Sequence, residues 1–324
     1  MDQYRAVLEV LKWMHPLDIL SGPYFVTKKW VEACNSSELW SEFLPAGSIS
    51  QGNSPKQLYS LTFTNSIFLA LPTKLLSFHL PTHTWLEKPL SRTIPVNTMC
   101  TMTLAGLDYV LILGLNSCTE NTVRVQISTG RVEPVPLMTP NRRLIGPISY
   151  RGRTFAFCGY TSEATQYCNV IGHRSIEWTK LGKAGQKRYN FNPCEKADSI
   201  YLLGGNSQKV PGEVYDVGRG TFSPLPYSLQ IAYCVTVVEG ESAFIVTKGK
   251  LTKKELASGS SRLIAKLSPS LVADVYSGFT PIIYEGKAYF LQRVFARVVE
   301  ISLATGQWQG NWYPGERTHY RSKK

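Results

Sequence analysis

The sequence lacks any long apolar run and any close pair of cysteines. Its longest apolar segment, residues 109–115, is far shorter than the about 20 residues that cross a bilayer. Charged residues near the start, such as Asp2 and Arg5, interrupt the apolar core of a secretion signal. We expect a soluble cytoplasmic or nuclear protein with no membrane partner. No Cys-x-x-Cys motif occurs, and we expect reduced, buried thiols at Cys34, Cys100, Cys118, Cys158, Cys168, Cys194 and Cys234.

Acidic residues are scarce relative to basic ones. The 324 residues include 35 Lys and Arg but only 23 Asp and Glu, which gives a net charge of +12 at pH 7. This excess favours acidic partners, but charge alone does not indicate nucleic-acid binding, and we do not expect it. Hydrophobic residues at 43% and charged residues at 18% are typical of a globular protein with a large core.

Aromatic residues recur in short apolar segments along most of the chain. They lie 41, 46, 46, 43 and 45 residues apart, at Phe68, Tyr109, Phe155, Tyr201, Phe244 and Tyr289. Most follow a tight-turn signal such as Arg151-Gly152-Arg153. A unit that recurs every about 40 to 50 residues cannot bury its apolar face alone, and stacked four-stranded units close into a ring. The spacing predicts a mainly β fold, a six-bladed β-propeller.

The third and fourth units show the repeated strand pattern most clearly. In the third, four strands are predicted between residues 148 and 181, with Trp178 in the outermost. The fifth unit is irregular, because the polar segment 248–261 resembles a long insertion. Five or seven blades therefore remain alternatives to six.

The first 45 residues differ from the rest. Apolar residues there recur at helical spacing, and Pro16 ends the first helix. Residues 45–55 are rich in Gly, Pro, Ser and Asn, which is typical of a linker. We predict a helical module over 1–45, a linker over 46–56, the propeller over 57–313 and a basic tail over 314–324.

The helical module resembles an F-box. The segments VLKWMHPLDIL (10–20), FVTKKW (25–30) and Glu38-Leu39-Trp40 follow the family pattern of an apolar helix, Asp-Pro-x-Asp-Leu, valine-cysteine-lysine-x-Trp and Leu-Trp. Trp30 and Trp40 match the two tryptophans of that pattern. Its leading Leu-Pro-x-Glu has no counterpart here, and Thr27 stands in place of its cysteine.

The repeats resemble the kelch family. Gly204-Gly205 after a strand, Tyr215-Asp216 in the next, Phe222 and then Leu225-Pro226 follow that family's repeat in order. The other units keep at most one glycine at the doublet position. The two modules together are similar to kelch-repeat F-box proteins. This resemblance implies a non-catalytic substrate receptor of an Skp–cullin–F-box ubiquitin ligase, and the alternative is a scaffolding propeller with a degenerate F-box.

The same resemblance implies that the helical module docks on an Skp-type adaptor and, through it, on a cullin. Exposed apolar side chains on a small helical module usually mark an interface. The predicted adaptor-binding residues are Leu8, Leu11, Trp13, Pro16, Leu17, Ile19 and Leu20. The alternative is that these side chains form the core of the module or pack against its own propeller.

Basic residues gather in segments that the kelch resemblance places on one loop face. Two of these segments link successive blades, and a third joins the middle strands of the fifth blade. Such residues suit an acidic or phosphorylated segment of a target protein. The predicted substrate-binding residues are Arg142, Arg143, Lys187, Arg188, Lys250, Lys253 and Lys254. The alternative is a solvated rim, and Arg143 and Arg188 also match a position where kelch repeats often have arginine, which favours a structural role.

Enzyme motifs are absent from the sequence. It contains no Gly-x-Ser-x-Gly elbow, no phosphate-binding loop and no Rossmann fingerprint. The five histidines are predicted to lie in the helical module, on outer strands and turns, and in the tail, at His15, His79, His83, His173 and His319. Because these places do not meet at the ring axis, we expect no metal, no cofactor and no catalysis.

Overall fold

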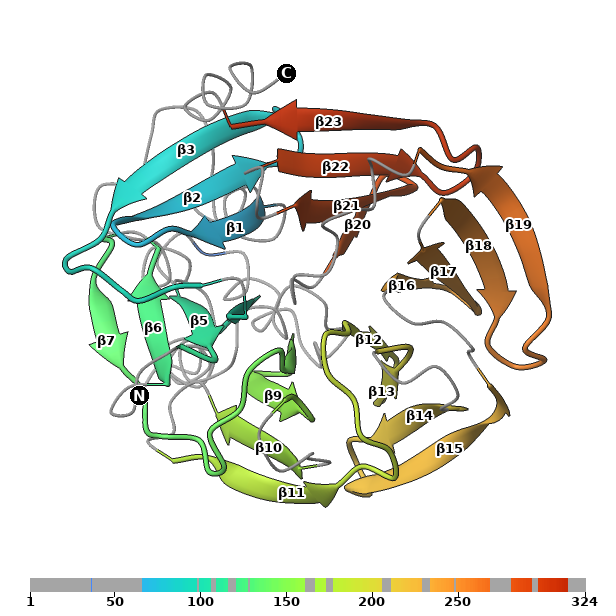
Figure 1. The fold of residues 1–324 in the computed structure, drawn as a ribbon, viewed down its shortest axis with the longest axis horizontal. Coiled ribbons are helices and arrows are strands. Elements are labelled where there is room, and N and C mark those ends of the chain that lie inside the picture. Colours follow the sequence, from blue (N-terminus) through green and yellow to red (C-terminus); the bar gives the residue numbers. More distant parts are fainter. Residues whose placement is uncertain are drawn as a thin grey trace.

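The computed structural model contains a ring of six β-sheets (Figure 1). It describes residue 36 and residues 66–97, 99–105, 109–115, 121–127, 129–160, 167–172, 177–205, 211–228, 234–247, 249–268, 281–292 and 297–313. Within these ranges the chain forms 23 strands and no helix. The prediction of a mainly β, six-bladed propeller is confirmed.

Each sheet is one blade, in which antiparallel strands follow one another in chain order. The first three blades are β1 (Ser66–Ala70), β2 (Lys74–His79) and β3 (Thr84–Pro89); β4 (Thr101–Leu104), β5 (Tyr109–Leu113), β6 (Thr122–Gln126) and β7 (Val132–Pro134); and β8 (Gly146–Tyr150), β9 (Arg153–Phe157), β10 (Tyr167–Gly172) and β11 (Thr179–Lys183). The last three are β12 (Pro193–Lys196), β13 (Ser199–Leu202), β14 (Pro211–Asp216) and β15 (Thr221–Ser228); β16 (Val235–Glu239), β17 (Ser242–Thr247), β18 (Lys250–Glu255) and β19 (Ser261–Lys266); and β20 (Ile282–Tyr284), β21 (Lys287–Gln292), β22 (Arg297–Ser302) and β23 (Trp308–Trp312).

The innermost strands surround the ring axis. β4 contacts β8, β8 contacts β12, β12 contacts β16, and β16 contacts β20. In the first blade the innermost described strand is β1, which contacts β21 of the sixth blade. The chain therefore runs once around the axis and brings its last blade beside its first.

The recurring aromatic residues mark the second strand of each four-stranded blade. Phe155, Tyr201, Phe244 and Tyr289 are each the third residue of that strand, and Phe68 is the third residue of β1. In the second blade Tyr109 opens β5, so that Leu111 takes the third position. The aromatic spacing thus located all six units, with a displacement of two residues in one of them.

The fifth unit is not irregular, so the predicted insertion over 248–261 is wrong. Residues 250–255 form β18, the third strand of an ordinary four-stranded blade, and pair with both β17 and β19. Leu251, which is fully buried, anchors this otherwise polar strand in the core. The third strand of a blade lies toward its outside, so one buried apolar residue is enough to hold β18 in the core. The sequence of this strand therefore shows no clear alternation of apolar and polar residues.

Apolar clusters fill every interface between neighbouring blades. Successive residues of a strand point to opposite faces of the sheet. In β9, Phe155 and Phe157 therefore pack in the cluster shared with the fourth blade, while Ala156 belongs to the cluster shared with the second. Further clusters join the fourth blade to the fifth, the fifth to the sixth, and the sixth to the first and second. Each blade thus buries both faces against its neighbours.

The first and sixth blades meet through Tyr313, which follows β23. Its buried ring lies edge-on to Trp85 of β3, with ring centroids 5.7 Å apart. The Tyr313 hydroxyl accepts a hydrogen bond of 2.9 Å from Lys74 Nζ and donates one to Glu87. Lys74 and Glu87 also form an ion pair of 3.0 Å across β2 and β3. These contacts join the two ends of the ring by side chains.

Five of the seven cysteines lie in the described ranges, and the side chains of four of them are described, at Cys100, Cys158, Cys194 and Cys234. All four are buried and none forms a disulfide, as predicted. Burial raises the pKa of the Cys194 and Cys234 thiols, which keeps them protonated.

The remaining cysteine side chains, the helical module apart from residue 36, the linker and the tail lie outside the described residues. Within the described part, no helix is long and apolar enough to span a bilayer.

Replacing Tyr313 with Phe tests the ring closure. The variant loses the hydroxyl that bonds to both Lys74 and Glu87, and we expect the free energy of unfolding to fall by about 1 to 3 kcal/mol. The control is Tyr160→Phe, because the exposed Tyr160 hydroxyl bonds to no described residue. Urea unfolding of both variants measures the effect, and equal stabilities would contradict the assigned role of Tyr313.

Candidate functional site

Loops from three consecutive blades meet on one face of the ring. In a four-stranded antiparallel blade, the loop between strands two and three emerges at the same end as the segment that leads to the next blade. Backbone hydrogen bonds join these loops across the second, third and fourth blades. Arg143 and Tyr160 exchange two such bonds of 3.0 and 2.7 Å, and Leu144 N donates to Met99 O at 3.0 Å. Asn190 N donates to Leu144 O at 2.9 Å, which continues the series.

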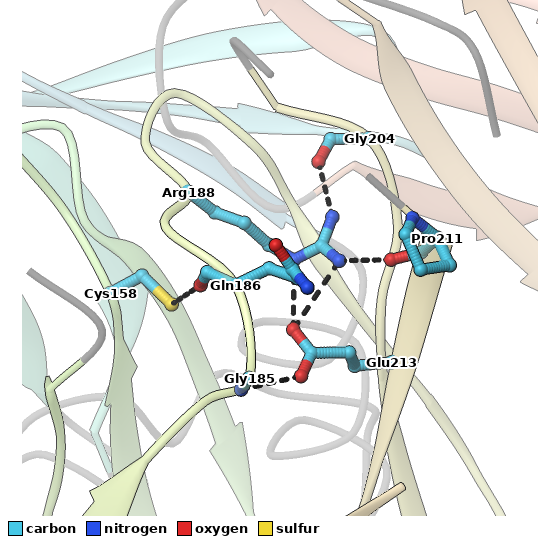
Figure 2. A network of polar contacts seen from close by, with 7 residues as sticks. All are labelled: Cys158, Gly185, Gln186, Arg188, Gly204, Pro211 and Glu213. Carbon is cyan, nitrogen blue, oxygen red and sulfur yellow. Dashed lines mark hydrogen bonds and ion pairs between the residues drawn. The ribbon is translucent and has the colours of Figure 1, made fainter. Parts of the chain in front are cut away.

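A buried arginine holds part of this loop face in place by hydrogen bonds. Arg188, which is 1% exposed, lies in the segment that leads from β11 to β12 (Figure 2). Its Nη1 donates to Gly204 O at 2.8 Å, its Nη2 donates to Pro211 O, and its Nε donates to Glu213 Oε2 at 3.3 Å. The other Glu213 oxygen accepts a bond of 2.6 Å from Gly185 N. The arginine thereby fixes the linking segment to the fourth blade.

Arg142 has the same role in the preceding linking segment. Its Nη1 donates to Cys158 O at 2.6 Å, and it precedes Cys158 by 16 residues, as Arg188 precedes Gly204. Both acceptors follow a second strand in the left-handed region, with φ of 52° at Cys158 and 72° at Gly204. The same arrangement therefore occurs twice. In each case a buried arginine binds a carbonyl at the start of the loop between strands two and three of the next blade.

The glycine after Cys158 permits this close approach. Gly159 has a φ of 113°, and a Cβ there would lie 2.9 Å from Arg143 O. Only glycine adopts this backbone conformation without strain. The single glycine that the third unit keeps at the doublet position is thus explained by contact with the linking segment.

The prediction that Arg142 and Arg188 form an exposed substrate-binding surface is wrong. Both side chains are buried. Arg188 donates to two carbonyls and to Glu213, and Arg142 donates to the Cys158 carbonyl and to Met138 Sδ. Burial lowers the pKa of the Arg188 guanidinium, and the Glu213 carboxylate opposes this effect. A buried charge needs such partners, so the structural alternative holds for Arg188. In the preceding segment it is Arg142, and not the predicted Arg143, that is buried.

Lys250, Lys253 and Lys254 do not form a basic loop, because they belong to strand β18. Adjacent residues of a strand face opposite sides, so Lys253 and Lys254 point apart. Lys253 pairs with Glu255 at 3.3 Å and lies 5.9 Å from the centre of the Phe244 ring. Partial burial lowers the pKa of the Lys254 ammonium. These three residues therefore do not gather into one patch.

Arg143 and Lys187 remain from the predicted substrate-binding set, and the structure adds two tyrosines and a methionine beside them. Tyr160 is 51% exposed, and its ring centroid lies 5.4 Å from that of Tyr189. Arg143 Nη1 lies 3.8 Å from Met99 Sδ, and Lys187 is exposed in the same linking segment as Tyr189. We refer to Met99, Arg143, Tyr160, Lys187 and Tyr189 as the tyrosine–arginine patch.

Sequence reasoning missed Met99, Tyr160 and Tyr189. The only signal in the sequence was their position: Tyr160 directly follows Gly159, and Tyr189 directly follows Arg188. Both tyrosines therefore lie next to residues that hold the chain against a neighbouring loop. Tyrosine and arginine are enriched among the residues that contribute most of the binding energy in protein–protein interfaces.

No group of three or more His, Cys, Asp or Glu in the described part of the chain could hold a metal ion. His79 lies on β2 and bonds to Thr82, and His83 lies in the following turn, 3.6 Å from Glu300. His15, His173 and His319 lie outside the described residues, as do all seven predicted adaptor-binding residues.

Comparisons with known proteins give no family for this chain. No protein-family model matches the sequence, and no curated protein is significantly similar to it. The structure shows the six-bladed propeller, and the kelch and F-box resemblances rest on the sequence motifs alone.

Replacing Arg188 with Ala tests the structural role of the buried arginines. The variant leaves Glu213 buried without its counter-charge, so we expect a loss of about 3 to 5 kcal/mol in the free energy of unfolding. The neighbouring Lys187→Ala is the control, because an exposed lysine contributes less than about 0.5 kcal/mol. Similar urea midpoints for both variants would refute this role.

Proposed function

We propose that this protein is a non-catalytic substrate receptor of an Skp–cullin–F-box ubiquitin ligase. The helical module docks on the Skp adaptor, and the loop face of the propeller captures a target protein. The observation that carries this proposal is the tyrosine–arginine patch on a rigid propeller that follows a sequence resembling an F-box.

The patch has the properties of a recognition surface. Its exposed side chains are aromatic, cationic or a flexible thioether, and its backbone is held by hydrogen bonds between loops. A backbone that is already ordered loses little entropy when a partner binds, which improves affinity. Arg143 and Lys187 suit an acidic or phosphorylated segment of the target, and Tyr160 supplies apolar area beside them.

The adaptor interface is tested by Leu11→Asp and Pro16→Asp. A charge at either position would be desolvated against an apolar partner, so we expect co-purification with an Skp protein to fall at least tenfold (about 1.4 kcal/mol). Lys29→Ala, at the variable position before Trp30 in the F-box-like segment, is the control. Undiminished co-purification of the Asp variants would remove the assigned interface, and no co-purification of the wild type would favour the scaffolding alternative.

Target capture is tested by Arg143→Ala and Tyr160→Ala. We expect both variants to lose the same co-purifying proteins while retaining the adaptor, because truncation of a central arginine or tyrosine typically costs about 2 kcal/mol or more in binding. Arg219→Ala is the matched control: its side chain is 84% exposed, in the β14–β15 turn on the opposite face of the ring.

Quantitative mass spectrometry of the purified complexes measures these losses. Proteins that depend on Arg143 and Tyr160 but not on Arg219 are the targets. If no protein shows this dependence, the loop face is not the capture surface.

A further inference from the structure

A cavity occupies the axis of the ring. Its volume is about 450 Å³, which lies within the range of small-molecule sites, roughly 300 to 1,000 Å³. The innermost strands of five blades contribute to its wall, and β1 completes it among the described strands. All six blades therefore contribute residues to this cavity.

The wall of the cavity is mostly apolar. Aliphatic side chains such as Leu104, Val238 and Ile283 predominate, with Phe68 beside them. Serine and threonine residues supply hydroxyl groups, of which Ser149 Oγ already donates to Leu104 O. Among the described residues that line the cavity, none is Lys, Arg or His, although the whole protein carries a net charge of +12.

Glu195 is the one carboxylic acid among these lining residues. It lies on β12 at the wall of the cavity, and its side chain is exposed to solvent. Within the described part of the chain its carboxylate has no hydrogen-bond or ion-pair partner in the structure. The adjacent Lys196 points to the opposite side of the strand and pairs with Glu241. The surrounding protein atoms desolvate the Glu195 carboxyl in part and raise its pKa, although the side chain keeps access to solvent.

We propose that the axial cavity binds a small amine whose ammonium group pairs with Glu195 and whose apolar body fills the space between the aliphatic walls. A single carboxylate is too few ligands for a divalent cation, and the lining offers no positive group to an anion. A neutral apolar ligand would desolvate the carboxylate without compensation, which costs free energy. An ammonium group with an apolar body satisfies both the carboxylate and the aliphatic wall. This site is separate from the loop face and does not depend on the proposed adaptor function.

Two probes that share an apolar body and differ in the charge of the head group test the proposal. Phenylbutylammonium and phenylbutanol share one apolar body, and isothermal titration of the full-length protein with each at neutral pH compares their affinities. We expect the ammonium probe to bind at least tenfold more tightly. Equal affinities, or no binding of either probe, would overturn the proposal without reference to any variant.

Variants then locate the site. Glu195→Gln keeps the size of the side chain and removes its charge, so we expect the preference for the ammonium probe to disappear. Glu133→Gln removes a carboxylate from the outer strand β7 and should leave the preference unchanged. Val238→Trp fills the cavity and should weaken both probes at least tenfold. A preference that persists in Glu195→Gln would place the amine elsewhere and overturn the assignment.

Discussion

The structure depends on the fact that each sheet has two apolar faces which only neighbouring sheets can cover. Phe155 and Phe157 on one side of β9, and Ala156 on the other, need the fourth and second blades respectively. The same holds for each blade, because no helix covers a sheet within the described residues. An open arc would leave two faces bare, so the first and sixth blades must meet. Trp85 and Tyr313 make that contact, and the pair Lys74 and Glu87 satisfies the Tyr313 hydroxyl inside it.

Closing the ring also shapes the face proposed to capture a target. A segment that leads from an outer strand to the next inner strand crosses the blade, and its polar backbone needs partners. Arg142 and Arg188 turn inward and bind carbonyls of the next blade, which holds these segments in place. Their neighbours Arg143 and Lys187 belong to the tyrosine–arginine patch. One short segment thus supplies both a structural cation and a surface cation, and burial distinguishes the two.

The sequence predicted the architecture better than the site. The aromatic spacing located all six blades because each interface needs a large residue at the same strand position, as at Phe155, Tyr201 and Tyr289. The roles of the basic residues were harder to predict, because charge does not show whether a side chain points into the protein or toward solvent. Arg142 and Arg143 are neighbours in the sequence, yet only Arg142 is buried. The segment with the β18 lysines was predicted as a loop, because Leu251 is the one buried apolar residue in that strand. The tyrosine pair and the axial cavity arise from residues of different blades, and no local pattern in the sequence brings them together.

Native-state hydrogen exchange measures the closure of the ring most directly. In a closed ring no blade is an end, so the amides of β1–β2 and β21–β22 should open with the same free energy as those of β9 and β13. In an open arc the terminal blades lack one neighbour each and would exchange first, as end units of linear repeat proteins do. Equal protection of all six blades is the expected result. Early exchange confined to the first and sixth blades would contradict the closed ring.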